Sequence, residues 1–213
     1  MSILTFIPLF ASHTTRSLAK LSRMPIWVNN SMRCELLWFI NHISNSDGAH
    51  MLKSVEWSPY DRMASTLVVY SDASGIGMGI WFPGEYTGFQ CSLPLKGPKD
   101  LIFFYKALAI CSTFHLGAEY ACDHIAVYSD NTNTVDMFAS LCAKPTYNPI
   151  LISTIDLAIN HSIATRVYYV PGKQNIIANC LSCFQNTRAL LLALKLCICI
   201  FQPPQDVMGA FKK

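Results

Sequence analysis

Two aspartates stand in the same short context, Tyr-Ser-Asp, and each directly follows an apolar segment. Asp72 comes after residues 67–70, and Asp130 comes after residues 125–128. β-Branched and aromatic residues in such runs are typical of buried strands. Acids at the carboxyl ends of neighbouring parallel strands point into one crevice. Because carboxylate oxygens suit divalent cations, the pattern predicts a shared metal site. Taken alone, it also fits a second interpretation, in which both acids only cap turns.

The composition fits a folded protein of modest charge. The chain has 213 residues, of which 52% are hydrophobic and 14% are charged, which is too apolar for a disordered chain and enough for a core. The length suits one domain with appendages. The formal net charge of +3 permits nucleic-acid binding, but the sequence contains no dense run of Lys and Arg that would indicate it alone.

The cysteines and the apolar stretches of the sequence indicate in which cellular compartment the protein is expected. Nine cysteines are scattered along the chain, and no pair of C-x-x-C motifs indicates zinc. We expect most of them to be reduced core thiols of an intracellular protein. The apolar stretch 189–201 is shorter than the roughly 20 residues of a membrane span and contains Lys195. The sequence therefore predicts no transmembrane helix.

The hydrophobic pattern predicts an α/β domain with a five-stranded mixed sheet flanked by helices. Three antiparallel strands come first, and two later strands should lie parallel to the first, because helices connect them. The expected strands are 66–71, 77–82, 86–91, 124–129 and 166–170, and the expected helices are 32–43, 101–120, 132–141, 148–161 and 174–184. Asn30 or Ser31 should cap the first helix. We divide the chain into a connector with one amphipathic helix (1–60), the α/β domain (61–185) and an apolar tail (186–213).

Three blocks of the sequence, 70–81, 127–134 and 169–182, carry a family resemblance. In order and spacing they resemble the ribonuclease H domain of retroelement reverse transcriptases, particularly copies from fungal retrotransposons. The resemblance implies a ribonuclease H-like fold over about residues 66–184. It also implies hydrolysis of the RNA strand of an RNA–DNA hybrid with two Mg²⁺ ions. The segment before the domain would then be the join to a polymerase, and we expect no polymerase domain within this sequence.

The resemblance also implies four metal-binding carboxylates, and only two of them are present. Asp72 and Asp130 match two of the family's acids, whereas Lys106 and Asn179 stand where the other two are expected. An ammonium close to the site repels a metal by several kcal/mol at intermediate dielectric. We therefore expect at most one weakly bound Mg²⁺, held by Asp72 and Asp130. Two hypotheses follow: a hybrid nuclease that is weakened or lost, and an inactive nucleic-acid-binding or connection module or retroelement remnant.

Other residues near these motifs have more than one possible role. Lys106 is either an ordinary helix residue or the partner of Asp72 or Asp130, and we favour the second interpretation. Ser74 and Asn131, with Ser71 and Thr132, either contact a phosphate or cap turns. Lys173 and Gln174 lie beside the expected site and are candidates for contact with a nucleic-acid backbone.

Overall fold

The computed structural model describes residues 29–45, 65–94, 102–120, 122–205 and 207. The chain forms two compact units, Met1–Glu56 and Trp57–Lys213. The described part of the first unit contains helix α2 (Asn30–Asn45). Its cap is Asn29, whose Oδ1 accepts a hydrogen bond from the Met32 N–H at 2.8 Å. The prediction of Asn30 or Ser31 as cap was therefore wrong by one position, because the helix includes Asn30.

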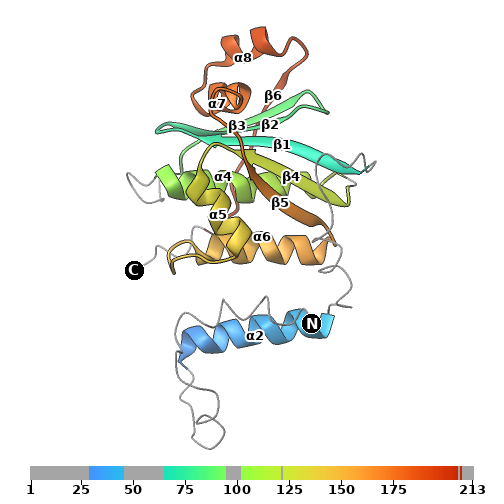
Figure 1. Cartoon of the computed structure of the whole chain (residues 1–213), viewed down its shortest axis with the longest axis vertical. Helices are drawn as coiled ribbons and strands as arrows, with labels where there is room; N and C mark the ends of the chain where they lie inside the picture. The colour runs from blue at the N-terminus through green and yellow to red at the C-terminus, as the bar shows by residue number, and fades with distance from the viewer. Residues whose placement is uncertain (1–28, 46–64, 95–101, 121, 206, 208–213) are drawn as a thin grey trace, which may run out of the picture. The chain divides into compact units, whose positions relative to one another are not determined.

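The second unit is built on one mixed sheet with the order β5-β4-β1-β2-β3-β6 (Figure 1). Strands β1 (Thr66–Ala73), β2 (Gly77–Phe82) and β3 (Thr87–Ser92) form an antiparallel meander. Strands β4 (His124–Ser129) and β5 (Ala164–Tyr169) extend the sheet in parallel from β1. These directions confirm the predicted α/β class.

The sheet has six strands among the described residues, not the five predicted. The additional strand, β6 (Cys197–Ile200), comes from the apolar tail and pairs in parallel with β3. A short apolar run cannot be assigned to a strand or a helix from periodicity alone. In this fold it covers the outer edge of β3, which would otherwise be an exposed strand edge.

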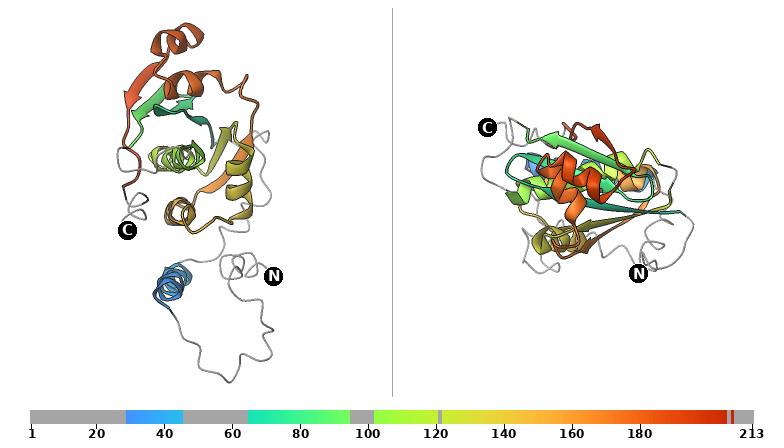
Figure 2. Two further views of the ribbon diagram at one scale, coloured as in Figure 1. Left: turned by 90° about the vertical axis from the view of Figure 1, so that its left-hand side faces the viewer. Right: turned by 90° about the horizontal axis from the view of Figure 1, so that it is seen from above.

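Helices cover both faces of the sheet (Figure 2). Helices α4 (Ile102–Gly117), α5 (Thr132–Ser140) and α6 (Asn148–Asn160) contribute to one core, together with Met78, Ile80 and Phe82 of β2. On the other face, α7 (Ile176–Ser182) and the segment that includes α8 (Asn186–Leu192) pack around Trp81. Successive residues of β2 thus serve opposite cores, as the strand period requires. No helix in the described ranges is long and apolar enough to cross a membrane.

Gly79 sets how closely α7 approaches the sheet. A Cβ at this position would lie 2.4 Å from both the Ala178 carbonyl oxygen and the Ser182 amide nitrogen. The side chain of any other residue would therefore overlap the backbone of α7. Gly77 and Gly79 both lie inside β2, the strand expected at 77–82, and Gly75 lies in the turn before it. The close packing places α7 beside the carboxyl end of β1.

Candidate functional site

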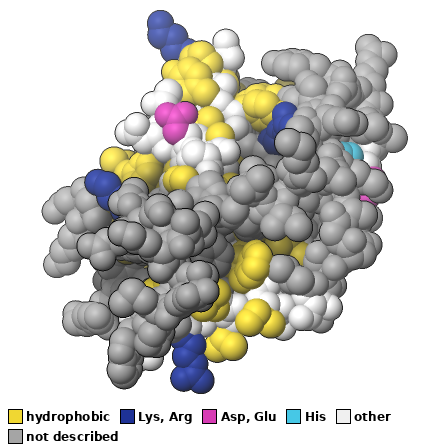
Figure 3. All heavy atoms as spheres, turned by 60° about the horizontal axis from the view of Figure 1, so that its bottom comes forward, with side chains coloured by type: hydrophobic (Ala, Val, Ile, Leu, Met, Phe, Trp, Pro, Cys, Tyr) yellow, Lys and Arg dark blue, Asp and Glu magenta, His cyan; other side chains and the backbone are white. Residues whose placement is uncertain are grey.

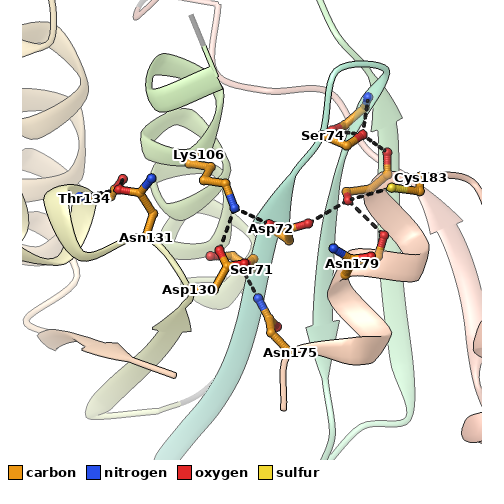
Figure 4. A network of polar contacts seen from close by, with 12 residues as sticks. Ser71, Asp72, Ser74, Lys106, Asp130, Asn131, Thr134, Asn175, Asn179 and Cys183 are labelled. Carbon is orange, nitrogen blue, oxygen red and sulfur yellow. Dashed lines mark hydrogen bonds and ion pairs between the residues drawn. The ribbon is translucent and has the colours of Figure 1, made fainter. Parts of the chain in front are cut away.

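One ammonium group joins the two predicted acids (Figure 4). Asp72 lies near the end of β1 and Asp130 directly follows β4, which is the parallel neighbour of β1. Lys106, near the start of α4, places its Nζ 2.7 Å from Asp72 Oδ1 and 2.5 Å from Asp130 Oδ1. The expectation that Lys106 pairs with these acids is confirmed. The three side chains come from segments that the sheet and α4 bring together.

The ion pairs are largely withdrawn from water. The Asp72 side chain is only 2% exposed and that of Lys106 14%. Burial is the largest influence on the pKa of Lys106 and lowers it. The charges of Asp72 and Asp130 and their hydrogen bonds act in the opposite direction and leave this pKa above its ordinary value. The lysine is therefore a firmly held cation at neutral pH.

Helix α7 supplies a hydrogen bond that the sequence did not reveal. The Ser182 hydroxyl donates to Asp72 Oδ2 at 2.8 Å, so both oxygens of this buried carboxylate have partners. At the other end of α7, the buried Asn175 donates through Nδ2 to the Ser71 carbonyl oxygen at 2.9 Å. Both residues lie inside the third sequence block, 169–182, and that membership was the only indication in the sequence that they belong to the site. Their partners in β1 are more than a hundred positions away.

Ser74 and Asn131 make contacts expected of turn and cap residues, and Ser74 also bonds to the end of α7. The Ser74 hydroxyl donates to the Ser182 carbonyl oxygen at 2.7 Å and accepts from the amides of Ile76 and Gly77. Asn131 Oδ1 accepts hydrogen bonds at 2.9 Å from the backbone amide and hydroxyl of Thr134, which caps α5. Of the two roles left open for these residues, these contacts fit capping. Contact with a phosphate stays a prediction.

The remaining predicted residues lie in α7 or just before it, and two of them, Lys173 and Asn179, line a hollow. Lys173 and Gln174 are exposed in the turn between β5 and α7. Asn179 is exposed on α7, on the side near Asp72 (Figure 4). An open hollow of about 430 Å³ is lined by Gly172, Lys173, Ile176, Asn179 and Arg188. The sequence did not single out Arg188, because it lies in the segment assigned to the tail.

The residues present do not fit a two-magnesium centre. Such a centre needs several anionic oxygen ligands, and two of the expected four positions hold Lys106 and Asn179. The Lys106 ammonium lies within hydrogen-bonding distance of both remaining carboxylates, so a divalent ion shared by them would have to displace it. No group of three or more His, Cys, Asp or Glu suited to a metal occurs in the described part of the chain.

Comparisons with known proteins give weak structural matches. No protein-family model matches the chain, and no curated protein does. LC11-RNase H1, solved in complex with an RNA/DNA hybrid, is 13% identical, with a TM-score of 0.44 over 54% of this chain and 92% of that one. The N-terminal RNase H domain of a Mycobacterium tuberculosis protein, fused to maltose-binding protein, is 14% identical, with a TM-score of 0.43 over 62% and 97%. RNase H1 from Halobacterium salinarum is 15% identical, with a TM-score of 0.41 over 60% and 99%.

Proposed function

We propose that region 61–185 is a retroelement-derived, ribonuclease H-like domain that binds RNA–DNA hybrid without hydrolysing it. The observation that carries this proposal is the position of Lys106, which holds Asp72 and Asp130 through direct ion pairs. The three sequence blocks support the ribonuclease H-like assignment and an RNA–DNA hybrid as the bound nucleic acid. Of the two hypotheses drawn from the sequence, the geometry therefore favours the inactive module over the weakened nuclease.

Lys106 replaces the electrostatic role of a metal but not its chemistry. Its single positive charge offsets part of the charge of two carboxylates, which allows them to be buried together. In the two-metal mechanism, the ions generate the attacking hydroxide and stabilise the leaving oxygen. An ammonium that is held by two carboxylates, with its pKa raised, supplies neither a bound hydroxide nor a general base at neutral pH. Phosphodiester hydrolysis is accordingly not expected.

Binding in this proposal comes from residues that line the hollow. Lys173 and Arg188 flank the hollow beside Asn179, and both are exposed. Cations of this kind neutralise backbone phosphates and give an affinity that falls as salt rises. Of the described residues that line the hollow, only these two are cations, and Figure 3 shows no cluster of described Lys and Arg side chains on the face that it draws. We therefore expect modest, strongly salt-dependent binding.

The test measures cleavage and binding on the same labelled RNA–DNA hybrid in the presence of Mg²⁺. The parent chain should bind without cleaving, and cleavage should return only in the double variant Lys106→Glu, Asn179→Asp. Lys144→Glu, an exposed position between α5 and α6, is the control for the change of charge. Efficient cleavage by the parent that Asp72→Asn abolishes would overturn the inactive assignment. Absence of binding even at low salt would overturn the nucleic-acid assignment.

A further inference from the structure

Strand β6 ends the sheet, and its outer side has no strand partner among the described residues (Figure 2). On its inner side, the Cys197 amide donates to the Tyr86 carbonyl at 2.8 Å and the Phe201 amide donates to the Gln90 carbonyl at 3.2 Å. Backbone groups alternate in direction along a strand. Residues 197, 199 and 201 therefore face β3, and the amides and carbonyls of Ile198 and Ile200 face outward.

Strand β6 itself carries neither a charge nor a proline, two features that commonly prevent strands from pairing between molecules, although it is short and the exposed Lys195 precedes it. Residues 197–200 contain no charge and no proline, and Pro203 follows only after the strand has ended. Ile200 is 74% exposed, and the preceding segment exposes Leu191 and Leu194 to 73% and 88%. Soluble proteins commonly place charges, proline or a bulge at such edges. An uncharged strand that exposes Ile200 favours strand addition.

We propose that β6 pairs in an antiparallel direction with β6 of a second copy of this chain. The sequence Cys-Ile-Cys-Ile is self-complementary in this arrangement, since no like charges would face each other. Two copies related by a two-fold axis pair the same edge with itself, so neither copy has a free β6 edge left for a third. The outward backbone groups supply the hydrogen bonds, and the exposed Ile200 supplies apolar surface to bury.

Within the bounds of β6, one register of this pairing uses all of the outward backbone groups, whereas sliding toward the carboxyl end would need Gln202, which lies beyond the strand. Placing Ile198 opposite Ile200 of the second copy uses every outward amide and carbonyl of both strands. A register shifted toward the amino end of β6 would require a hydrogen bond from the Leu196 amide to the second copy. That amide already donates to the Ala193 carbonyl at 2.9 Å. The preferred register places Cys199 opposite Cys199 of the second copy at a non-hydrogen-bonded position, where Cα atoms are about 4.5 Å apart.

The first experiment measures the mass of the full chain by analytical ultracentrifugation under reducing conditions, over a wide range of protein concentration. The parent should reach the mass of two chains, and Ile200→Lys should remain at the mass of one. Ile76→Lys, at a 58% exposed position in the β1–β2 turn, is the matched control and should dimerise like the parent. Ile200→Pro removes an outward amide but no bond to β3, so it tests the backbone contribution. Circular dichroism verifies that each variant is folded.

The second experiment identifies the register. A short bismaleimide, which adds to one thiol at each end, should link Cys199 of one copy to Cys199 of the other. Because Cys197 lies beside Cys199 in the same chain and would compete for the reagent, the reaction is run on Cys197→Ser. Peptide mapping should find the link in this variant, and the added change Cys199→Ser should lose it. Cys142→Ser, added instead at an exposed cysteine far from β6 in the sequence, should retain it. A parent of one-chain mass at every concentration would overturn the proposal, as would a folded Ile200→Lys dimer or linkage confined to Cys34 and Cys142.

Discussion

The Lys106 ammonium is shared between Asp72 and Asp130, at 2.7 Å from one carboxylate and 2.5 Å from the other. Asp72 lies near the end of β1, Asp130 follows the parallel neighbour β4, and α4 brings the lysine to both. Their mutual repulsion is offset by a cation that belongs to the chain itself. This arrangement makes the site dependent on Lys106 for its stability.

Removal of this cation should destabilise the protein. Lys106→Met keeps most of the side-chain length but leaves two carboxylates close together and without their partner. Breaking a buried ion pair in this way costs about 3 kcal/mol or more. Chemical denaturation should show a loss of that size, whereas Lys144→Met at an exposed position should change the free energy of unfolding by less than about 0.5 kcal/mol. Equal stability of the two variants would contradict the assigned role.

Stability should also depend on Lys106 at alkaline pH. The pKa of Lys106 is raised in the folded state, so its contribution is fully present below the unfolded-state pKa. It is lost as pH rises through the higher, folded-state pKa. The free energy of unfolding of the parent should thus fall faster above about pH 10 than that of Lys106→Met.

The same comparison controls for other alkaline groups. Burial raises the pKa of Cys91 to about 12, and burial also raises that of Tyr105. These acids also reduce stability as pH rises, because they ionise more readily in the unfolded chain. Cys91 and Tyr105 are present in both the parent and Lys106→Met. The difference between their two curves of unfolding free energy against pH therefore reports the contribution of Lys106 alone. Parallel curves would show that its pKa is not raised.

The sequence predicted the centre of this site because its geometry follows from topology. The meander leaves β3 parallel to β1, and α4 connects β3 to β4. Strand β4 is therefore expected to lie parallel to β1, with the acids at the ends of the two strands adjacent. Lys106 was placed at the site by the family resemblance, which implies a metal-binding acid at its position. Ser182 and Asn175 were missed because their contacts depend on how closely α7 approaches Gly79, and sequence spacing does not give that distance. The same limit applied to β6, whose pairing depends on the free edge of β3.

The contact between α7 and Asp72 should contribute measurably to stability. Ser182→Ala removes the hydroxyl that donates to Asp72 Oδ2 and leaves that buried oxygen without this donor. A hydrogen bond to a charged group contributes about 1.5–3 kcal/mol, so we expect a loss of about 2 kcal/mol. Ser140→Ala, at an exposed serine of α5, is the matched control. Thermal unfolding should rank the two variants, and a smaller loss for Ser182→Ala would be inconsistent with the contact.

The approach of α7 to the sheet should be sensitive to a single methyl group. Gly79→Ala places a Cβ at 2.4 Å from backbone atoms of Ala178 and Ser182, which cannot move independently of the helix. Overpacking typically costs about 1–3 kcal/mol, and we expect at least the upper value here. Gly75→Ala is the control, because a Cβ at that position would meet no atom within 4 Å beyond its neighbours in the chain. Measured unfolding energies should separate the two, and a neutral Gly79→Ala would mean that α7 packs less closely.

Response to Mg²⁺ separates a lost metal centre from a weak one. With Lys106 between the acids, added Mg²⁺ or EDTA should leave the melting temperature of the parent unchanged. In Lys106→Glu, Asn179→Asp, four acidic positions replace two, and a bound ion stabilises the folded state by an amount that grows with its concentration. We therefore expect the melting temperature of the double variant to rise with Mg²⁺, and Asp72→Asn added to it should abolish the rise. A parent that is stabilised by Mg²⁺, with the effect lost in Asp72→Asn, would show that the cation displaces Lys106 and that the carboxylates still serve as metal ligands.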